Sequence, residues 1–364
     1  MYDFLIVGAG LFGSVFAHEA TKRGKRCLVI DKRPHIGGNL FCEAVEGVVV
    51  HTYGAHIFHT SDKRIWDYMN RFAVFNRYTH SPIADYRGEI FNLPPNMNTF
   101  YKLWGSAAPD EARAIIADQS ACIADPKNLE EYAISLFGTD IYIKLIKDYT
   151  EKKWGRSCSE LPADLLNHLP LRFTYDNNYF QTGYQGIPIG GYNQIFEKML
   201  TNCDVKLGYD FFADKSRYRH ISKKIVYTGN IDEYFEYCFG ALEYRSLAFE
   251  TEILSTTNFQ GNSIVNYTSS DVPYTRIIEH KHFEFCSQEK TVISYEYPVE
   301  MTSDHEPYYP VRDAKNMIIY KKYLELAQRE KNIIFGGRLG TYRKVDMWQT
   351  VYEALSSAVA VMDN

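Results

Sequence analysis

The chain has 364 residues, 40 of them basic and 45 acidic, which gives a formal net charge of -5. Because nucleic-acid binding relies on clustered lysine and arginine, a mildly acidic chain without a basic run is a poor candidate for it. No run approaches the roughly 20 apolar residues of a membrane-spanning helix, so membrane insertion is not expected either.

The amino terminus leads directly into an apolar run, without the basic region of a signal peptide. The seven cysteines are scattered and form no C-x-x-C pair, which is typical of reduced thiols. Both features predict a cytoplasmic protein.

The N-terminal segment has the pattern of a strand, a helix and a second strand. The apolar run Phe4–Val7 is followed by Gly8-x-Gly10-x-x-Gly13, a helical stretch to about Arg23, and an apolar run at Cys27–Ile30 that ends at Asp31. This order predicts two parallel strands joined by a helix, with a glycine turn against which a dinucleotide pyrophosphate can lie. An acidic residue about 20 positions after the first glycine is expected to bind a ribose hydroxyl, the role we assign to Asp31.

Two further glycine pairs bear on the choice of dinucleotide. Lys32 and Arg33 lead into Gly37-Gly38-Asn39, and Gly336-Gly337-Arg338 follows a late apolar run. A plain NAD-binding fold does not need the first pair, and both resemble features of large FAD enzymes. Each pair alone could be an ordinary turn, but together with the first motif they favour FAD. The sequence has no second glycine motif between a strand and a helix for a nicotinamide cofactor.

The segment Tyr53–His59 places two histidines three residues apart, beside Gly54 and Ala55. No third ligand stands at a metal-binding spacing, so we expect no metal site. The small residues would let a planar ring approach closely, which predicts that His56 and His59 are polar groups at a flavin. The alternative is a structural role for both.

Residues from about 98 to 153 have helical periodicity. Asn128 and Glu131 resemble a capping box, and Gly138 should end the helix that they begin. A second helix should then run towards Trp154.

The rest of the chain has a different character. Residues 164–193 are polar and rich in Tyr, Asn and Gly, which favours a functional loop. Residues from about 242 to 298 alternate as in an antiparallel sheet, and a strand at 333–335 precedes a closing helix. The chain therefore begins and ends with α/β character.

Aromatic side chains are frequent, with 29 tyrosines and 22 phenylalanines. Tyrosine and tryptophan can stack on a base or cover a sugar, and arginine pairs bidentately with phosphate. Each such residue alone could be simple packing, but their concentration in the loop and the late sheet favours a substrate that contains a nucleotide. The set is Tyr149, Trp154, Arg172, Tyr179, Phe180, Tyr184, Arg276, Tyr308, Tyr309 and Tyr342.

Short stretches over nearly the whole chain resemble the UDP-galactopyranose mutase family, flavoenzymes that interconvert pyranose and furanose forms of a nucleotide-linked galactose. The most specific stretches are YGAHIFHT and VPYTRIIEHKHF. The others are MYDFLIVGAGLFGSV, DKRPHIGGN, NLPPNMNTF, YTEKKWGR, RFTYDNNYF, YQGIPIGGY, FGALEYRSL, EPYYPV and IIFGGRLGTYRKVDM.

The resemblance implies a mixed α/β fold in three parts. These are a Rossmann-like FAD-binding domain at 1–80, about 185–240 and 325–364, an inserted helical bundle at about 98–165 with a mobile loop to about 180, and an antiparallel β-sheet domain at about 81–97 and 241–324. It also implies a homodimer, an FAD that is active when reduced by NAD(P)H or another reductant, and a role in supplying cell-surface polysaccharide. In such enzymes the reduced flavin N5 attacks the anomeric carbon and displaces the nucleoside diphosphate. A flavin–sugar iminium then lets the ring open and reclose.

Matching positions carry the family's site residues onto this chain, and none of them is expected to bind a metal. The catalytic set is His56, His59 and Arg276. The substrate-binding set is His80, Tyr149, Trp154, His168, Arg172, Tyr179, Phe180, Arg276, Tyr309, Lys344 and Asp346. The cofactor-binding set is Gly8, Gly10, Phe12, Gly13, Asp31, Lys32, Gly38, Asn39, His56, Ile57, Arg338, Asp346 and Met347.

Three positions depart from the family pattern. A lid arginine is His168 here, a phosphate-contacting tyrosine is Lys344, and a sugar-contacting asparagine is His80. We hypothesise that Lys344 partly restores the positive charge lost at 168, although lysine lacks the fork of arginine. Three altered contacts suggest an altered substrate, so dTDP-fucopyranose and UDP-N-acetylgalactosamine stay open beside UDP-galactopyranose.

Two other interpretations share the same FAD fold. An oxidoreductase of the amine-oxidase type would have its flavin reduced by substrate alone. A mutase needs a reductant first and then gives an isomer without net redox change. The three departures also leave open a flavin-binding scaffold without activity.

Overall fold

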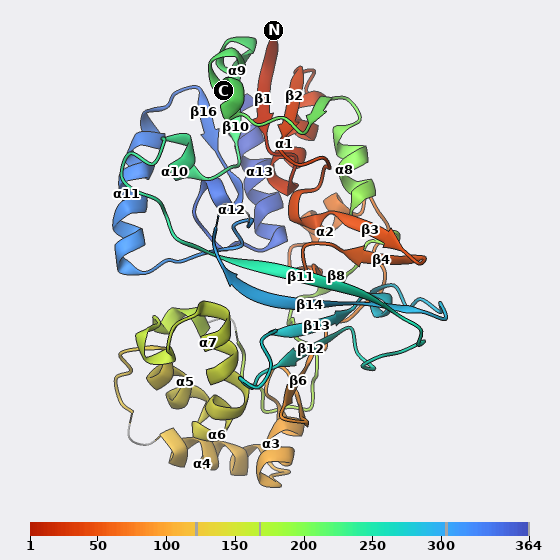
Figure 1. Ribbon diagram of the computed structural model, residues 1–364, viewed down its shortest axis with the longest axis vertical. Coiled ribbons are helices and arrows are strands. Elements are labelled where there is room, and N and C mark those ends of the chain that lie inside the picture. The colour runs from red at the N-terminus through yellow and green to blue at the C-terminus, as the bar shows by residue number, and fades with distance from the viewer. Residues whose placement is uncertain (121–122, 167–168, 303–304, 363–364) are drawn as a thin grey trace.

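The computed structural model describes residues 1–120, 123–166, 169–302 and 305–362. A parallel sheet and a larger, mostly antiparallel sheet form its framework, and a group of helices lies beside the larger sheet (Figure 1). The described cysteines are free thiols. In the described part of the chain, no helix is long and apolar enough to cross a lipid bilayer.

The parallel sheet has the strand order β16-β10-β1-β2-β9, with β1 at its centre. The glycine motif joins β1 to α1 (Leu11–Lys22), and β1 and β2 lie side by side in parallel, as the sequence predicts. Strand β16 is only half-buried because it lies at the edge of the sheet. The strands are β1 (Tyr2–Val7), β2 (Cys27–Asp31), β9 (Asp204–Leu207), β10 (Ser222–Tyr227) and β16 (Ile333–Phe335).

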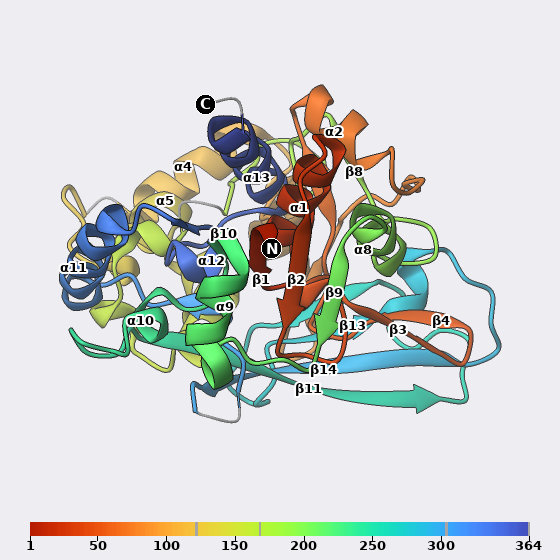
Figure 2. The same cartoon turned by 90° about the horizontal axis from the view of Figure 1, so that it is seen from above.

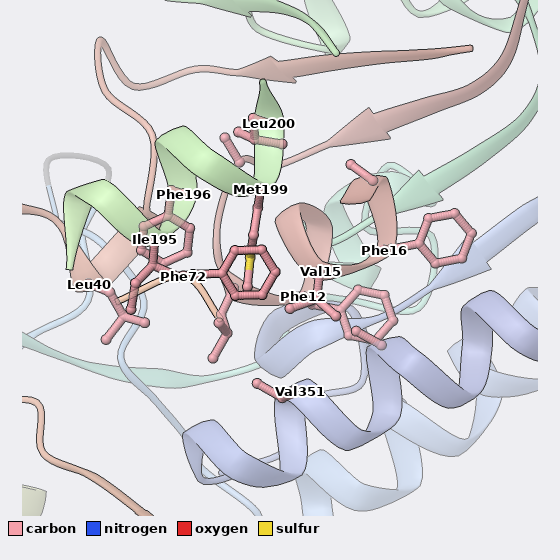
Figure 3. Close-up of a cluster of buried hydrophobic side chains, with 14 of the residues drawn as sticks. Phe12, Val15, Phe16, Leu40, Phe72, Ile195, Phe196, Met199, Leu200 and Val351 are labelled. Carbon is pink, nitrogen blue, oxygen red and sulfur yellow. The ribbon is translucent and has the colours of Figure 1, made fainter. Parts of the chain in front are cut away.

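Helices cover both faces of this sheet, because successive side chains of a strand point to opposite faces. Phe4 and Ile6 of β1 pack on the face covered by α1, α8 (Asn193–Leu200) and α13 (Met347–Met362). Leu5 packs on the other face, with α9 (Lys215–Ile221) and α10 (Ile231–Tyr234) (Figure 2). The first face forms the largest apolar core, in which Phe16 of α1 and Val351 of α13 are fully buried (Figure 3).

The larger sheet has the strand order β15-β11-β14-β13-β12-β6-β7. The predicted antiparallel pairing is confirmed for β11 to β14, but β6 pairs in parallel with β12. Strand β6 comes from a distant part of the chain, so no tight turn forces it to run antiparallel to β12. The strands are β6 (Ile83–Tyr86), β7 (Glu89–Asn92), β11 (Tyr244–Leu254), β12 (Ile264–Tyr267), β13 (Arg276–Glu279), β14 (Thr291–Glu300) and β15 (Tyr309–Pro310).

The helical group contains the two helices that the sequence predicts. Asn128 caps the first by accepting from the N–H of Glu131 at 2.9 Å, and Gly138 ends it. The Glu131 carboxylate accepts from the N–H of Lys127 rather than from that of Asn128, so the capping box is displaced by one residue. The group comprises α3 (Met97–Trp104), α4 (Pro109–Ser120), α5 (Leu129–Phe137), α6 (Thr139–Ile141), a π-helical segment (Tyr142–Lys147) and α7 (Asp148–Trp154).

The predicted functional loop at 164–193 contains a short strand, β8 (Tyr184–Gly186). It pairs with β5 (Phe58–Thr60), so the loop returns to the segment that carries the two histidines. A second ribbon joins β3 (Cys42–Val45) to β4 (Val48–His51), and α2 (Lys63–Met69) follows β5. Short 3-10 helices occur at Gly38–Leu40, Cys158–Glu160, Ala163–Leu166, Phe212–Asp214 and His280–Phe283.

One predicted boundary falls inside a helix. α11 (Ala314–Arg329) packs against α10, although the sequence interpretation divides the sheet domain from the FAD-binding domain near 325. The short α12 (Gly337–Gly340) follows β16. The division into three domains stays a prediction.

Candidate functional site

One cavity of about 1450 Å³ joins the parallel sheet, the larger sheet and the helical group. It begins where β1 ends and α1 starts, and it extends to β13 and α7. Pockets for small ligands measure roughly 300–1000 Å³, so this cavity can hold more than one. The predicted site residues in the described part of the chain line it, apart from Gly13. His168 lies outside the described residues.

Three glycines form an open cradle at the start of α1. A side chain at Gly8 (φ +106°) would meet Thr228 Oγ1 at 2.0 Å, and one at Gly38 would lie 3.1 Å from the Cα of Gly10. Gly10 precedes α1 without a side-chain cap, and no acidic residue stands in the first turn. The N–H groups of this turn therefore remain available to a phosphate, and the cradle fits a dinucleotide.

Two residues of the dinucleotide motif also have structural duties. Gly13 does not line the cavity, and a side chain there would lie 2.1 Å from the Gly8 carbonyl oxygen. It therefore serves the close packing of α1 on β1. The Asp31 carboxylate accepts from the N–H groups of Ala9 at 2.8 Å and Arg33 at 2.9 Å, which holds it at the cavity wall with lone pairs to spare.

His56 and His59 lie in the same cavity, in different environments. Burial lowers the pKa of His56 to about 4, so its ring is neutral near pH 7. The Gly54 carbonyl oxygen lies 2.7 Å from Nδ1, which assigns the proton to Nδ1 and leaves the Nε2 lone pair free to accept. His59 stacks on Phe180 with 3.7 Å between ring centres, and burial lowers its pKa as well.

His80 is buried where the loop meets the larger sheet. Burial lowers its pKa to about 3, so the ring is neutral. Its Nδ1 lies 3.3 Å from the hydroxyl of Tyr78, and the rings of Tyr179 and Phe180 lie 5.3 and 5.4 Å away. His80 and these two aromatic residues therefore form one wall of the cavity.

Arg276 owes its position to a carboxylate that sequence reasoning missed. Glu296 of β14 is almost fully buried, and its Oε1 lies 2.8 Å from Nε of Arg276. The hydroxyl of Thr275 donates to the same oxygen at 3.1 Å. The sequence feature that could have identified Glu296 is its negative charge at an inward-facing position of a predicted strand. The pair leaves a fixed guanidinium in the wall of the cavity.

Arg172 lines the cavity but is engaged by its own loop. Its guanidinium donates to the carbonyl oxygen of Asn178 and, at 2.8 Å, to that of Tyr179. The side chain is 4% exposed and lies 3.4 Å from the Asp176 carboxylate. Arg172 therefore fixes the shape of the loop that presents Tyr179 and Phe180.

Three tyrosines that the sequence interpretation grouped with the site do not line it. Tyr342 is fully buried, with its hydroxyl 2.7 Å from the Val311 carbonyl oxygen. Tyr308 is buried as well, and Tyr184 stacks on Trp66. Their roles are in packing, because aromatic composition alone does not distinguish a core from a cleft.

The chain matches known mutases over its whole length. A family model described as UDP-galactopyranose mutase matches residues 144–344, and one described as an NAD(P)-binding Rossmann-like domain matches residues 6–72. The chain is 40% identical to a probable UDP-galactopyranose mutase of Klebsiella pneumoniae, over 98% of this chain and 94% of that protein. It is 37% identical to dTDP-fucopyranose mutase of Escherichia coli, over 100% of this chain and 99% of that protein.

A crystal structure of reduced UDP-galactopyranose mutase superposes with a TM-score of 0.80, over 100% of this chain and 94% of that chain. The sequence identity of 15% means that this likeness shows the fold alone. It confirms the predicted fold class, a mixed α/β fold with a Rossmann-like domain.

Proposed function

The chain belongs to the UDP-galactopyranose mutase family of isomerases, and we propose that it interconverts pyranose and furanose forms of a sugar carried on a nucleoside diphosphate, with FAD as cofactor. The observation that carries this proposal is the continuity of the cavity. The glycine cradle at one end opens directly into walls that bear Arg276, Tyr309 and Lys344. A dinucleotide and a nucleotide sugar could therefore meet in one space.

The residues present fit FAD. Gly10, Gly38 and the first N–H groups of α1 would hold its pyrophosphate, and Asp31 would bind a ribose hydroxyl. His56 and Arg338 would lie along the ring. When bound and reduced, the flavin supplies the nucleophile of the reaction. The reductant and the route through the flavin that the family resemblance implies stay predictions.

The chain's own residues bind and orient the substrate. Arg276, held by Glu296, offers a fixed guanidinium to a diphosphate. Tyr149 and Trp154 of α7 offer rings that can cover a base or sugar. The loop that Arg172 braces places Phe180 against His59, where it would exclude water from the reacting sugar.

UDP-galactopyranose is the first candidate substrate and dTDP-fucopyranose the second. The second is favoured by the dTDP-fucopyranose mutase relative and by the aromatic wall around His80. Fucose has a methyl group where galactose has a hydroxymethyl group, and an apolar wall accepts a methyl group at a lower desolvation cost. UDP-N-acetylgalactosamine is the third candidate substrate.

The test incubates dithionite-reduced enzyme with each of the three nucleotide sugars and separates the products by chromatography. We expect a furanose isomer from at least one of them, without net oxidation, and none from oxidised enzyme. Bleaching of the oxidised flavin by substrate alone would instead indicate an oxidoreductase. No product and no trapped adduct with any of the three would indicate a scaffold without activity.

Two further features of the protein are proposals as well. We propose a homodimer, which sedimentation equilibrium can check, and a cytoplasmic location, which cell fractionation can check. A monomer at micromolar concentration, or recovery with the membrane or exported fraction, would contradict them.

A further inference from the structure

Three cationic side chains lie within about 6 Å of the centre of the Tyr309 ring, and a fourth, Arg276, acts on one of them through its charge. Lys153 Nζ lies 4.7 Å from the ring centre, and Lys344 Nζ lies 5.9 Å from it. The guanidinium carbon of Arg338 is also 5.9 Å away. The charge of Arg276 acts on Lys153, and all five residues line the cavity. Sequence reasoning included Lys344 in this group but missed Lys153.

Two of these cations contact aromatic rings but have no oxygen partner among the described residues. Glu296 pairs with Arg276, but the side-chain ammonium groups of Lys153 and Lys344 make no ion pair or hydrogen bond with the described residues. The neighbouring Lys152 shows the contrast. Its ammonium donates to the carbonyl oxygens of Tyr267, Val272 and Tyr274 at 2.8, 3.2 and 3.0 Å. Lys152 thus joins α7 to the larger sheet, whereas Lys153 is free to bind a ligand.

The charges around the two lysines do not balance. Three charged residues act on Lys153: Arg276 of β13, Glu296 of β14 and Arg338 of α12. Its ammonium also lies over the rings of Tyr149 and Tyr309. Burial, followed by repulsion from Arg276, lowers its pKa to about 8. Lys344 is faced by Lys153, Tyr309, Arg338 and Asp346. Desolvation by the surrounding protein, followed by repulsion from Lys153, lowers its pKa to about 8. The electrostatic repulsion between these cationic side chains decreases when an anion binds between them.

We propose that Lys153 and Lys344 together bind the diphosphate of the nucleotide sugar beside Tyr309, with Lys153 as a binding residue additional to Arg276. This rests on the proposed function, because a nucleotide-sugar substrate brings a second diphosphate besides the pyrophosphate of FAD, which the glycine cradle would hold. It also assigns a purpose to Lys344 at a position where the family pattern has tyrosine. Two point charges would replace a hydroxyl and the lid arginine as phosphate partners.

The test measures binding of UDP and of uridine to the FAD-loaded enzyme by titration calorimetry. Lys153→Met and Lys344→Met should each raise the Kd for UDP about tenfold or more, since each removes a charge-assisted contact. The Kd for uridine, which has no phosphate, should stay within about twofold of the wild-type value. Lys322→Met is the matched control, because Lys322 also lies beside an aromatic ring, Phe239, but is exposed on α11.

The pH dependence gives a second readout. In the wild type the Kd for UDP should rise by well over tenfold between pH 7 and pH 9.5, as two ammonium groups with pKa values of about 8 lose their charge. The double variant Lys153→Arg, Lys344→Arg should bind UDP with little change over this range, because arginine stays charged. If Lys153→Met and Lys344→Met weaken the binding of uridine as much as that of UDP, the lysines do not act on the diphosphate, and the assignment is overturned.

The failures of the two proposals can be told apart. If wild type binds UDP and Lys153→Met binds it equally well, the lysine pair is not the diphosphate site although the proposed function stands. If wild type binds neither UDP nor dTDP but does bind inorganic pyrophosphate through Lys153, the proposed substrate class is wrong while the anion site stands.

Discussion

Glu279 of β13 shows how one buried charge can hold a distant loop. Its carboxylate accepts from the N–H groups of Phe259 and Gln260, both at 2.9 Å, and from the hydroxyl of Thr291 at 2.7 Å. Burial alone would raise its pKa, but His282 and these hydrogen bonds outweigh burial and lower the pKa to about 2. The ionised form therefore contributes stability above about pH 4.5, which is lost as the pH falls towards 2.

Replacing Glu279 with Gln should lower the free energy of unfolding at pH 7 by roughly 2–4 kcal/mol, because an amide turns one acceptor into a donor facing backbone N–H groups. Denaturant unfolding measures this difference. It should shrink as the pH is lowered below 4.5, since the unfolded wild-type chain then binds a proton at this carboxyl that the folded protein binds only near pH 2, while the amide does not titrate. The matched control is Glu252→Gln, which alters an exposed carboxylate on β11. A difference that persists undiminished at pH 3 would contradict the argument.

At this scale, the sequence predicts residues whose roles are local. Gly8 and Gly10 could be assigned because their duties follow from one turn, and Asn128 because a cap acts within three residues. Glu296 and Lys153 could not, because their roles depend on partners brought together only by the tertiary fold. Lys152 donates to three carbonyl oxygens and the ammonium of Lys153 to none of the described residues, yet the sequence alone does not distinguish these two adjacent lysines.

At the scale of elements, the loop before β8 depends on Arg172. Replacing Arg172 with Ala should raise the KM for the nucleotide sugar by roughly ten- to hundredfold, because two backbone carbonyl oxygens lose their donor and the aromatic residues after them lose their position. Steady-state kinetics measures this, and limited proteolysis should show faster cleavage of the loop.

Arg172→Lys is the informative companion variant. A lysine keeps the charge but cannot serve two carbonyl oxygens with a planar fork, so its KM should lie between those of wild type and Arg172→Ala. A KM for Arg172→Lys equal to that of wild type would mean that only the charge matters. It would favour a direct contact of Arg172 with phosphate over bracing of the loop.

Helices and strands could be predicted from the sequence where the apolar residues recur at a regular spacing and the paired segments follow one another in the chain. The first strand, helix and strand, the helices around Gly138 and the antiparallel strands β11 to β14 all have such patterns. The parallel pairing of β6 with β12 and of β16 with β10 joins segments far apart in the chain, and periodicity has no information on it. The same reason explains why α11 crosses the predicted boundary near 325.

At the scale of the whole molecule, the surplus of tyrosine is mostly a feature of the cores. Tyr192, Tyr227, Tyr234, Tyr323 and Tyr342 are among the largest fully buried side chains. Fewer tyrosines line the cavity, among them Tyr149, Tyr179 and Tyr309. Tyrosine can serve both places because its ring packs in a core while its hydroxyl finds a carbonyl oxygen.

The cavity is bounded by the parallel sheet, the larger sheet and the helical group, so a ligand in it links all three. Removing FAD should therefore lower the thermal unfolding temperature by roughly 3–4 °C relative to enzyme with FAD at about 100 times its Kd, where binding adds about 2.7 kcal/mol. Calorimetry on deflavinated and reconstituted protein measures this shift. FMN is the control: it lacks the adenosine half that Asp31 and the start of α1 would hold, so its shift should be clearly smaller. If FMN raises the unfolding temperature as much as FAD does, the adenosine half of FAD contributes nothing to binding. The glycine cradle would then bind a ligand other than the cofactor.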